Sequence, residues 1–119
     1  MTKLSDSELK VMAIIWEFEP CSAKFVSQKL EEQVGWNINT TYTTIKSCIK
    51  KGAVQRTDPN FICTALVSKD SVAISKTEDL VDKLYHGATE LLFASMIKNK
   101  KLTPEQLESL RKMIDEIDE

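Results

Sequence analysis

The sequence predicts a mainly α-helical protein with a small β-hairpin: a winged helix-turn-helix followed by C-terminal dimerisation helices. Three observations support this. Three amphipathic segments precede residue 52, and the first two begin with capping residues. Two short β-prone runs, 53–57 and 61–67, then flank the turn signal Asp58-Pro59-Asn60. The remainder returns to a helical pattern, so we expect a winged-helix DNA-binding domain over 1–67 and a helical dimerisation domain over 68–119.

The first two helices are expected over about 6–18 and 23–33. Ser5 and Glu8 have the spacing of a capping box at the start of the first. Four residues follow at the spacing of a buried stripe: Leu9, Met12, Ala13 and Trp16. Pro20 ends this helix, and Ser22 can cap the next.

The third helix, expected over about 39–51, separates apolar from polar side chains. One side gathers Thr41, Ile45, Cys48 and Ile49. The opposite side and its flanks gather Asn39, Thr40, Tyr42, Thr43, Lys46, Ser47, Lys50 and Lys51. Residues 37–57 contain no Asp or Glu, although the chain carries 18 in all. This local positive charge indicates a polyanionic partner.

The polar face has the chemistry of a DNA recognition helix, although a solvated helix face would show a similar pattern. Small side chains let a helix approach base edges, and flanking cations contact phosphates. Thr43, Lys46 and Ser47 suit the first role. The residues that suit phosphate contact are Lys50, Lys51 and Arg56.

The C-terminal part is expected to form helices over about 69–84, 86–98 and 104–117, with Gly87 as a bend. Thr103 and Gln106 have capping-box spacing, with Pro104 at the first helical position. Three thin amphipathic helices give little core by themselves, so we expect a second copy of the chain to cover them. The residues predicted at this dimer interface are Leu80, Leu84, Leu91, Leu92, Met96, Leu107, Leu110, Met113, Ile114 and Ile117.

Several function classes are not supported by the sequence. His86 is the one histidine, and the three glycines form no phosphate-binding loop, so we expect no catalytic residue, metal site or cofactor. Three widely spaced cysteines without a CxxC pair favour reduced thiols in the cytoplasm. The longest apolar run, 11–16, is too short to span a membrane, and no signal peptide is visible.

With these elements in place, the chain resembles the penicillinase-repressor family, the winged-helix repressors of β-lactam resistance and their copper-responsive relatives. Five segments carry the resemblance in the family's order: LSDSELKVMAIIWE, Trp36 followed by TTYTTIKSCIKKG, ALVSKD, LYHGATELL and LTPEQLESLRKMIDE. The resemblance implies a homodimeric repressor that reads an inverted repeat in double-stranded DNA. It implies DNA contacts from the third helix and from the wing near Asn60, the helix residues being Thr40, Tyr42, Thr43, Lys46, Ser47 and Lys50.

The chain departs from the family in places that bear on its signal. The wing tip has Pro59-Asn60 where many members have Gly-Arg, and the third helix has Tyr42 and Ser47 where several members carry an arginine. The Asn-Phe cleavage site of the β-lactam-responsive members is replaced by Ser95-Met96, and the Cys-x-Cys pairs of the copper-responsive members are absent. The inducing signal, and any regulatory protein or protease, is therefore not predicted.

Two alternative functions remain open at the level of sequence. The winged helix could serve as a protein–protein interaction module, with the third helix packed on a protein partner. The chain could also be a thiol- or metal-responsive regulator that uses Cys21, Cys48 and Cys63. Steep weakening of binding by salt would favour DNA over an apolar protein contact.

Overall fold

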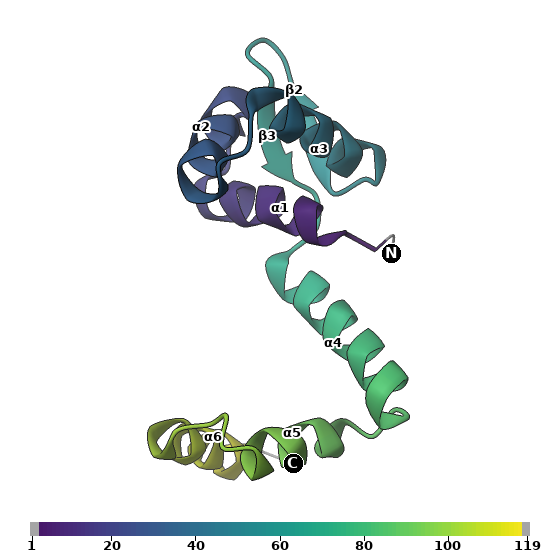
Figure 1. Cartoon of the computed structure of the whole chain (residues 1–119), viewed down its shortest axis with the longest axis vertical. Helices are drawn as coiled ribbons and strands as arrows, with labels where there is room; N and C mark the ends of the chain where they lie inside the picture. The colour runs from purple at the N-terminus through teal and green to yellow at the C-terminus, as the bar shows by residue number, and fades with distance from the viewer. Residues whose placement is uncertain (1–2, 118–119) are drawn as a thin grey trace. The chain divides into compact units, whose positions relative to one another are not determined.

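The computed structural model describes residues 3–117 of the chain. These residues form six helices and three strands (Figure 1). The chain divides into two compact units, Met1–Val72 and Ala73–Glu119, called here the winged unit and the helical unit. The predicted division after residue 67 stays a prediction. In the structure, the first turn of α4 (Lys69–Tyr85) belongs to the winged unit, and its Val72 is buried there.

Three capped helices build most of the winged unit. They are α1 (Asp6–Phe18), α2 (Ala23–Val34) and α3 (Ile38–Lys50). Ser5 and Glu8 form the predicted capping box of α1. Ser22 caps α2 by accepting a hydrogen bond from the Phe25 amide, and Gly35 ends that helix with a φ of 72°. Asn37 caps α3, so that helix lies close to its predicted range.

A three-stranded antiparallel sheet completes the winged unit, in the order β1-β3-β2. Strands β2 (Val54–Thr57) and β3 (Ile62–Ala65) are the predicted hairpin. The sequence did not predict β1 (Cys21–Ser22), which pairs with β3 and places Cys21 opposite Cys63. This short strand ties the start of α2 to the wing.

The core of the winged unit forms where α1 packs against α2, α3 and β3. The predicted buried stripe of α1 is wrong at Ala13, which is exposed, while Val11, Ile14 and Ile15 are buried. The reason is that the packed face of α1 is centred on Glu8, Val11, Met12 and Ile15, at the spacing i, i+3, i+4 and i+7, and Ala13 lies on the opposite side of the helix. The other fully buried large side chains include Met12, Leu30 and Ile45.

The helical unit contains the rest of α4, then α5 (Thr89–Lys98) and α6 (Pro104–Asp115). The bend predicted at Gly87 is present, since His86 and Gly87 both have positive φ, and α5 therefore begins at Thr89 and not at about residue 86. Thr103 and Gln106 form the predicted capping box of α6. Neither α5 nor α6 contains a buried residue. Among the described helices, none is both long and apolar enough to cross a membrane.

Candidate nucleic-acid interface

Helix α3 is held by its predicted apolar side. Thr41, Ile45 and Cys48 are completely buried, and the helix packs against both α1 and α2. The predicted polar side points outward, with five exposed members: Asn39, Thr40, Thr43, Lys46 and Lys50. Three other predicted DNA-binding residues are half-buried and contact neighbouring elements: Tyr42, Ser47 and Lys51. The helix is therefore anchored by its buried side and presents an exposed polar face.

The wing is joined to α3 by a cluster of aromatic and charged side chains. The Tyr42 ring meets the Phe61 ring edge-on, with centroids 5.6 Å apart. The Arg56 guanidinium lies 3.7 Å from the centroid of the Phe61 ring, and its Nε donates to Asp58 Oδ1 at 3.1 Å. These contacts position Arg56 beside α3 but also supply it with a carboxylate partner. Asn60 is exposed in the turn, with a φ of 77°.

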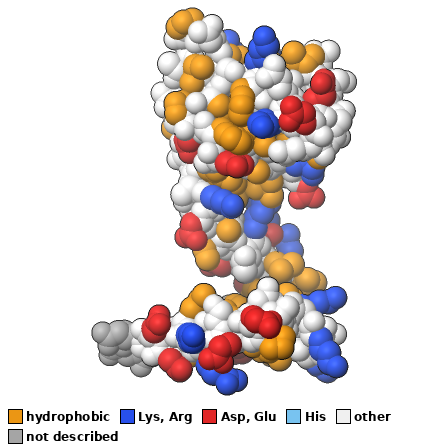
Figure 2. Space-filling view, turned by 90° about the vertical axis from the view of Figure 1, so that its left-hand side faces the viewer, with side chains coloured by type: hydrophobic (Ala, Val, Ile, Leu, Met, Phe, Trp, Pro, Cys, Tyr) orange, Lys and Arg blue, Asp and Glu red, His pale blue; other side chains and the backbone are white. Residues whose placement is uncertain are grey.

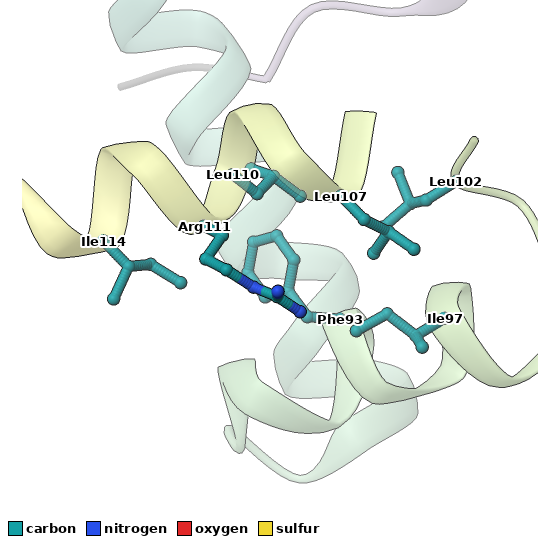
Figure 3. Close-up of a pocket in the computed structure, with 7 residues that line it drawn as sticks. All are labelled: Phe93, Ile97, Leu102, Leu107, Leu110, Arg111 and Ile114. Atoms are coloured by element: carbon teal, nitrogen blue, oxygen red, sulfur yellow. The ribbon is translucent and has the colours of Figure 1, made fainter. Parts of the chain in front are cut away.

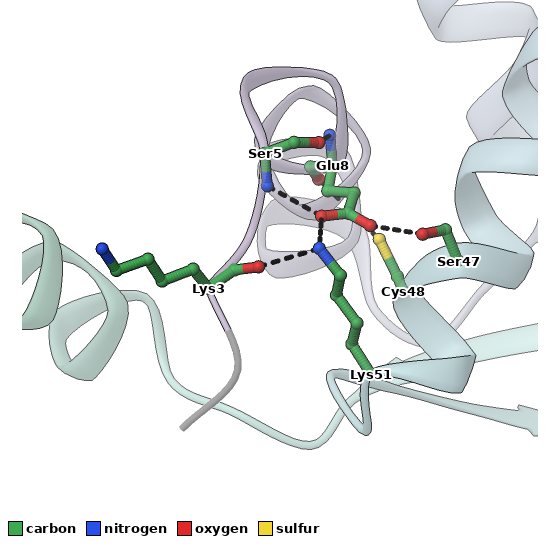
Figure 4. A network of polar contacts seen from close by, with 6 residues as sticks. All are labelled: Lys3, Ser5, Glu8, Ser47, Cys48 and Lys51. Carbon is green, nitrogen blue, oxygen red and sulfur yellow. Dashed lines mark hydrogen bonds and ion pairs between the residues drawn. The ribbon is translucent and has the colours of Figure 1, made fainter.

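Glu8, which sequence reasoning treated only as a capping residue, connects α1 to α3 (Figure 4). Its Oε1 accepts from the Ser5 amide at 2.7 Å and from Lys51 Nζ at 2.6 Å. Its Oε2 accepts from the Ser47 hydroxyl. Lys51 Nζ also donates to the Lys3 carbonyl oxygen at 2.8 Å. The Glu8 side chain is 5% exposed and the Lys51 side chain 30%, so a nearly buried carboxylate pairs with a partly exposed lysine.

The contacts of Glu8 keep its carboxylate ionised. Burial by itself would raise the pKa of Glu8, but hydrogen bonds from Lys51, Ser47 and the Ser5 backbone, with the charge of Lys51, hold the pKa at about 2. The structure thus gives Ser47 and Lys51 an internal partner in addition to any external one. Their predicted contacts with DNA stay predictions.

The helical unit has an apolar groove between α5 and α6, with a volume of about 560 Å³. Figure 3 shows side chains from both helices facing this space. Its lining includes three of the predicted interface residues and four others: Leu107, Leu110 and Ile114, with Phe93, Ile97, Leu102 and Arg111. Phe93 and Leu102 were missed as members of this surface because they fall outside the helical stripe that the sequence showed most clearly.

The remaining predicted interface residues lie on the surface of the helical unit, where hydrophobic side chains alternate with charged ones (Figure 2). Leu92 is half-buried. The others are exposed: Leu80, Leu84, Leu91, Met96, Met113 and Ile117. Apolar surface of this extent is typical of a contact with another molecule.

Comparison with known proteins identifies the family. The family model described as penicillinase repressor matches residues 4–116. The chain belongs to the penicillinase repressor family. It is 26% identical over 115 residues to the methicillin resistance regulatory protein MecI of Staphylococcus aureus (strain N315), covering 95% of this chain and 94% of MecI. It is 24% identical over 116 residues to the penicillinase repressor of Bacillus licheniformis, covering 96% of this chain and 91% of that one.

Two solved structures confirm the winged helix-turn-helix fold. The DNA-binding domain of the repressor BlaI in solution has a TM-score of 0.53 and 30% identity, and the match covers 58% of this chain and 90% of that domain. The monomeric form of Bacillus licheniformis BlaI in complex with the blaP half-operator has a TM-score of 0.50 and 28% identity, covering 58% of this chain and 87% of that one.

The three thiols of this penicillinase repressor family member are all buried and free. Burial, and then the charge of Glu8, raise the pKa of Cys48 to about 12. Burial, and then the neighbouring Cys21, raise the pKa of Cys63 to about 11. Burial also raises the pKa of Cys21. Because the thiolate is the reactive form, these environments disfavour the thiol-responsive alternative.

Proposed function

We propose that this chain is a cytoplasmic, non-enzymatic transcriptional repressor that binds operator DNA as a homodimer and needs no cofactor. The observation that carries the proposal is the outward face of α3, which is polar, basic and free of carboxylates. Thr43 and Lys46 would reach base edges in the major groove, and Lys50 would contact a phosphate. Membership of a repressor family and the likeness to BlaI on a half-operator support this reading.

The dimeric part of the proposal is supported by the helical unit. Among the described residues, the helices and strands that pack closely on one another lie in the winged unit. The helices of the helical unit leave most of their apolar side chains exposed. A second copy that covers these side chains would bring two α3 helices onto one duplex. A twofold dimer would then read an inverted repeat, with its half-sites about one helical turn apart or a multiple of it.

The test is selection of binding sites from a pool of random duplexes with the full chain, followed by affinity measurements on the selected site. Thr43→Ala and Lys46→Ala should each relax preference at particular base pairs and cost about 1–3 kcal/mol on the selected site. Lys98→Ala is the matched control, because it removes an exposed lysine of α5 and should leave base preference unchanged.

The dimer is tested with the same duplexes. Wild-type protein should bind a single half-site far more weakly than the full site, because the second contact becomes intramolecular after the first. If the chain selects no sequence, or if neither α3 variant changes base preference, α3 is not the reading element and the proposal is wrong.

A further inference from the structure

The Ser47 hydroxyl lies at the edge of the outward face of α3, one helical turn from the exposed Thr43. Unlike Thr43, it is held from behind by a residue of another helix. Its proton is donated to Oε2 of Glu8, 39 residues earlier in the chain (Figure 4). The orientation of this hydroxyl is therefore set by α1 and not by free rotation.

A serine hydroxyl ordinarily both donates and accepts, since it has one proton and two lone pairs. Glu8 removes the first option. An ionised carboxylate can only accept, and the pKa of about 2 keeps Glu8 ionised at any pH at which DNA binding is measured. Its other oxygen, Oε1, already accepts from the Ser5 amide and from Lys51 Nζ, so both oxygens face donors. The Ser47 oxygen can therefore only accept a further hydrogen bond, through its lone pairs.

In the major groove this restriction determines which bases Ser47 can contact. Adenine N6 and cytosine N4 offer amino donors there, whereas guanine O6 and N7 and thymine O4 are acceptors. We propose that Ser47 is a specificity-determining residue that accepts a hydrogen bond from an adenine or cytosine amino group and disfavours guanine and thymine at the same position. The proposal rests on the proposed function, because it needs α3 in the major groove.

Thr44 provides a useful contrast on the same helix. Its Oγ1 donates to the Thr40 carbonyl oxygen at 2.8 Å, so its proton is also held inside the protein. That acceptor is backbone, and no substitution changes its polarity. The acceptor for Ser47 is a side chain, so the hydrogen-bonding polarity of Ser47 can be altered by a residue that does not touch DNA.

Glu8→Gln should reverse that polarity. The amide oxygen is the group that can accept from the Ser5 amide and Lys51, so it takes the place of Oε1. The amide nitrogen then takes the place of Oε2 and donates to the Ser47 oxygen. Ser47 must accept this bond, and its own proton turns toward the DNA. Gln also serves in a capping box, so α1 keeps its start.

The experiment compares binding-site selection for the full-length wild type, Ser47→Ala, Ser47→Thr, Glu8→Gln and Asp6→Asn. Ser47→Ala identifies the base pair that Ser47 reads, as the position whose preference is lost. Wild type and Ser47→Thr should prefer adenine or cytosine there, and Glu8→Gln should shift the preference to guanine or thymine. Asp6→Asn should keep the wild-type preference, because it removes an exposed carboxylate from the same turn of α1 and leaves the bond between Ser47 and Glu8 in place.

Base analogues test the wild type without any folding concern. Purine in place of that adenine, or pyrimidinone in place of that cytosine, removes only the amino group. Wild-type affinity should fall roughly 5- to 150-fold, the equivalent of one good base contact, and Ser47→Ala should be insensitive to the change.

Two outcomes would overturn the proposal in distinguishable ways. If Thr43→Ala and Lys46→Ala change base preference but Ser47→Ala does not, or if wild type prefers guanine or thymine at the Ser47 position, the polarity argument fails while α3 still reads DNA. If none of the α3 variants changes any preference, the proposed function fails, and the role of Ser47 fails with it.

Discussion

The two units use apolar residues in opposite ways. In the winged unit, Ile45 of α3 is completely buried, whereas Ile114 of α6 in the helical unit is 65% exposed. Among the described residues of the helical unit, only Val81 is buried. Both isoleucines lie on regular amphipathic helices. The contrast shows that periodicity predicts a helix and its apolar face, but not whether the same chain covers that face.

The largest effect is expected where the helical unit lacks its own core. Leu110→Lys would place a charge in the groove between α5 and α6 on each chain. In the proposed dimer two leucines, one from each chain, would lose their burial, which should weaken association by about 3–6 kcal/mol before any cost of the charge. Sedimentation equilibrium should show monomer at concentrations at which the wild type is dimeric.

Ser109→Lys is the matched control for Leu110→Lys. It adds the same charge to the same helix at an exposed position outside the apolar groove. It should leave the mass in solution unchanged. If Leu110→Lys also keeps the parental mass, the groove is not the dimer contact.

The next prediction tests whether the winged unit is complete by itself. Ile45→Ala should lower its free energy of unfolding by about 2–5 kcal/mol, and by the same amount at every protein concentration. In the proposed dimer Ile114 would be buried only by the partner, so Ile114→Ala should have an effect that grows as dilution approaches the dimer dissociation range. Urea unfolding at several concentrations separates the two. Equal, concentration-independent losses would contradict the contrast between the units.

The winged unit also contains a carboxylate, that of Glu8, which is ionised and nearly buried. The pKa of Glu8 lies near 2, below its ordinary value of 4.5. A depressed pKa contributes stability above pH 4.5, and that stability is lost as the pH falls toward 2. The loss should be on the order of 3 kcal/mol.

Thermal unfolding as a function of pH measures this loss. Glu8→Gln should show a flatter profile between pH 4.5 and 2. Asp6→Asn is the control, since it removes an exposed carboxylate from the same turn and leaves the Glu8 contacts in place. A Glu8→Gln profile that follows the wild type would show that Glu8 contributes little to folding.

The smallest effect concerns two adjacent lysines, one exposed and one paired with groups of the same chain. Lys50 is exposed, whereas Lys51 donates to Glu8 and to the Lys3 carbonyl oxygen. Lys50→Ala should reduce the dependence of log affinity on log salt by about 0.9. Lys51→Ala should change it less. Equal changes would mean that Lys51 leaves Glu8 when DNA binds.

Local signals in the sequence were sufficient for most of the winged unit. Capping by Ser5 and Ser22, the amphipathic pattern of α3 and the turn at 58–60 predicted three helices and a hairpin, since each depends on residues close together in the chain. Strand β1 was missed because two residues carry no periodicity and pair only with a distant strand. Ala13 was misplaced because the face of α1 that becomes buried depends on its neighbours in the fold, and the sequence of α1 alone does not specify them.

The candidate interface was predicted only in part, for a similar reason. The exposed face of α3 follows from helical geometry, so the exposure of Thr43, Lys46 and Lys50 was predicted, while their contacts with DNA stay predictions. The bonds from Ser47 and Lys51 to Glu8 join helices far apart in sequence, and the capping role of Glu8 already accounted for its presence. In the helical unit, the roles predicted for the apolar residues stay predictions, since they depend on a second molecule.

Both tryptophans of the chain, Trp16 and Trp36, belong to the winged unit. The Trp16 indole donates to the Val67 carbonyl oxygen at 2.9 Å, at the end of the wing, and Trp36 packs against the core just before α3. Fluorescence excited at the red edge of the indole band therefore reports on this unit and is blind to the helical unit. Circular dichroism sees helices in both. An unfolding experiment that follows the two signals together can resolve which unit melts first, without any label or added probe.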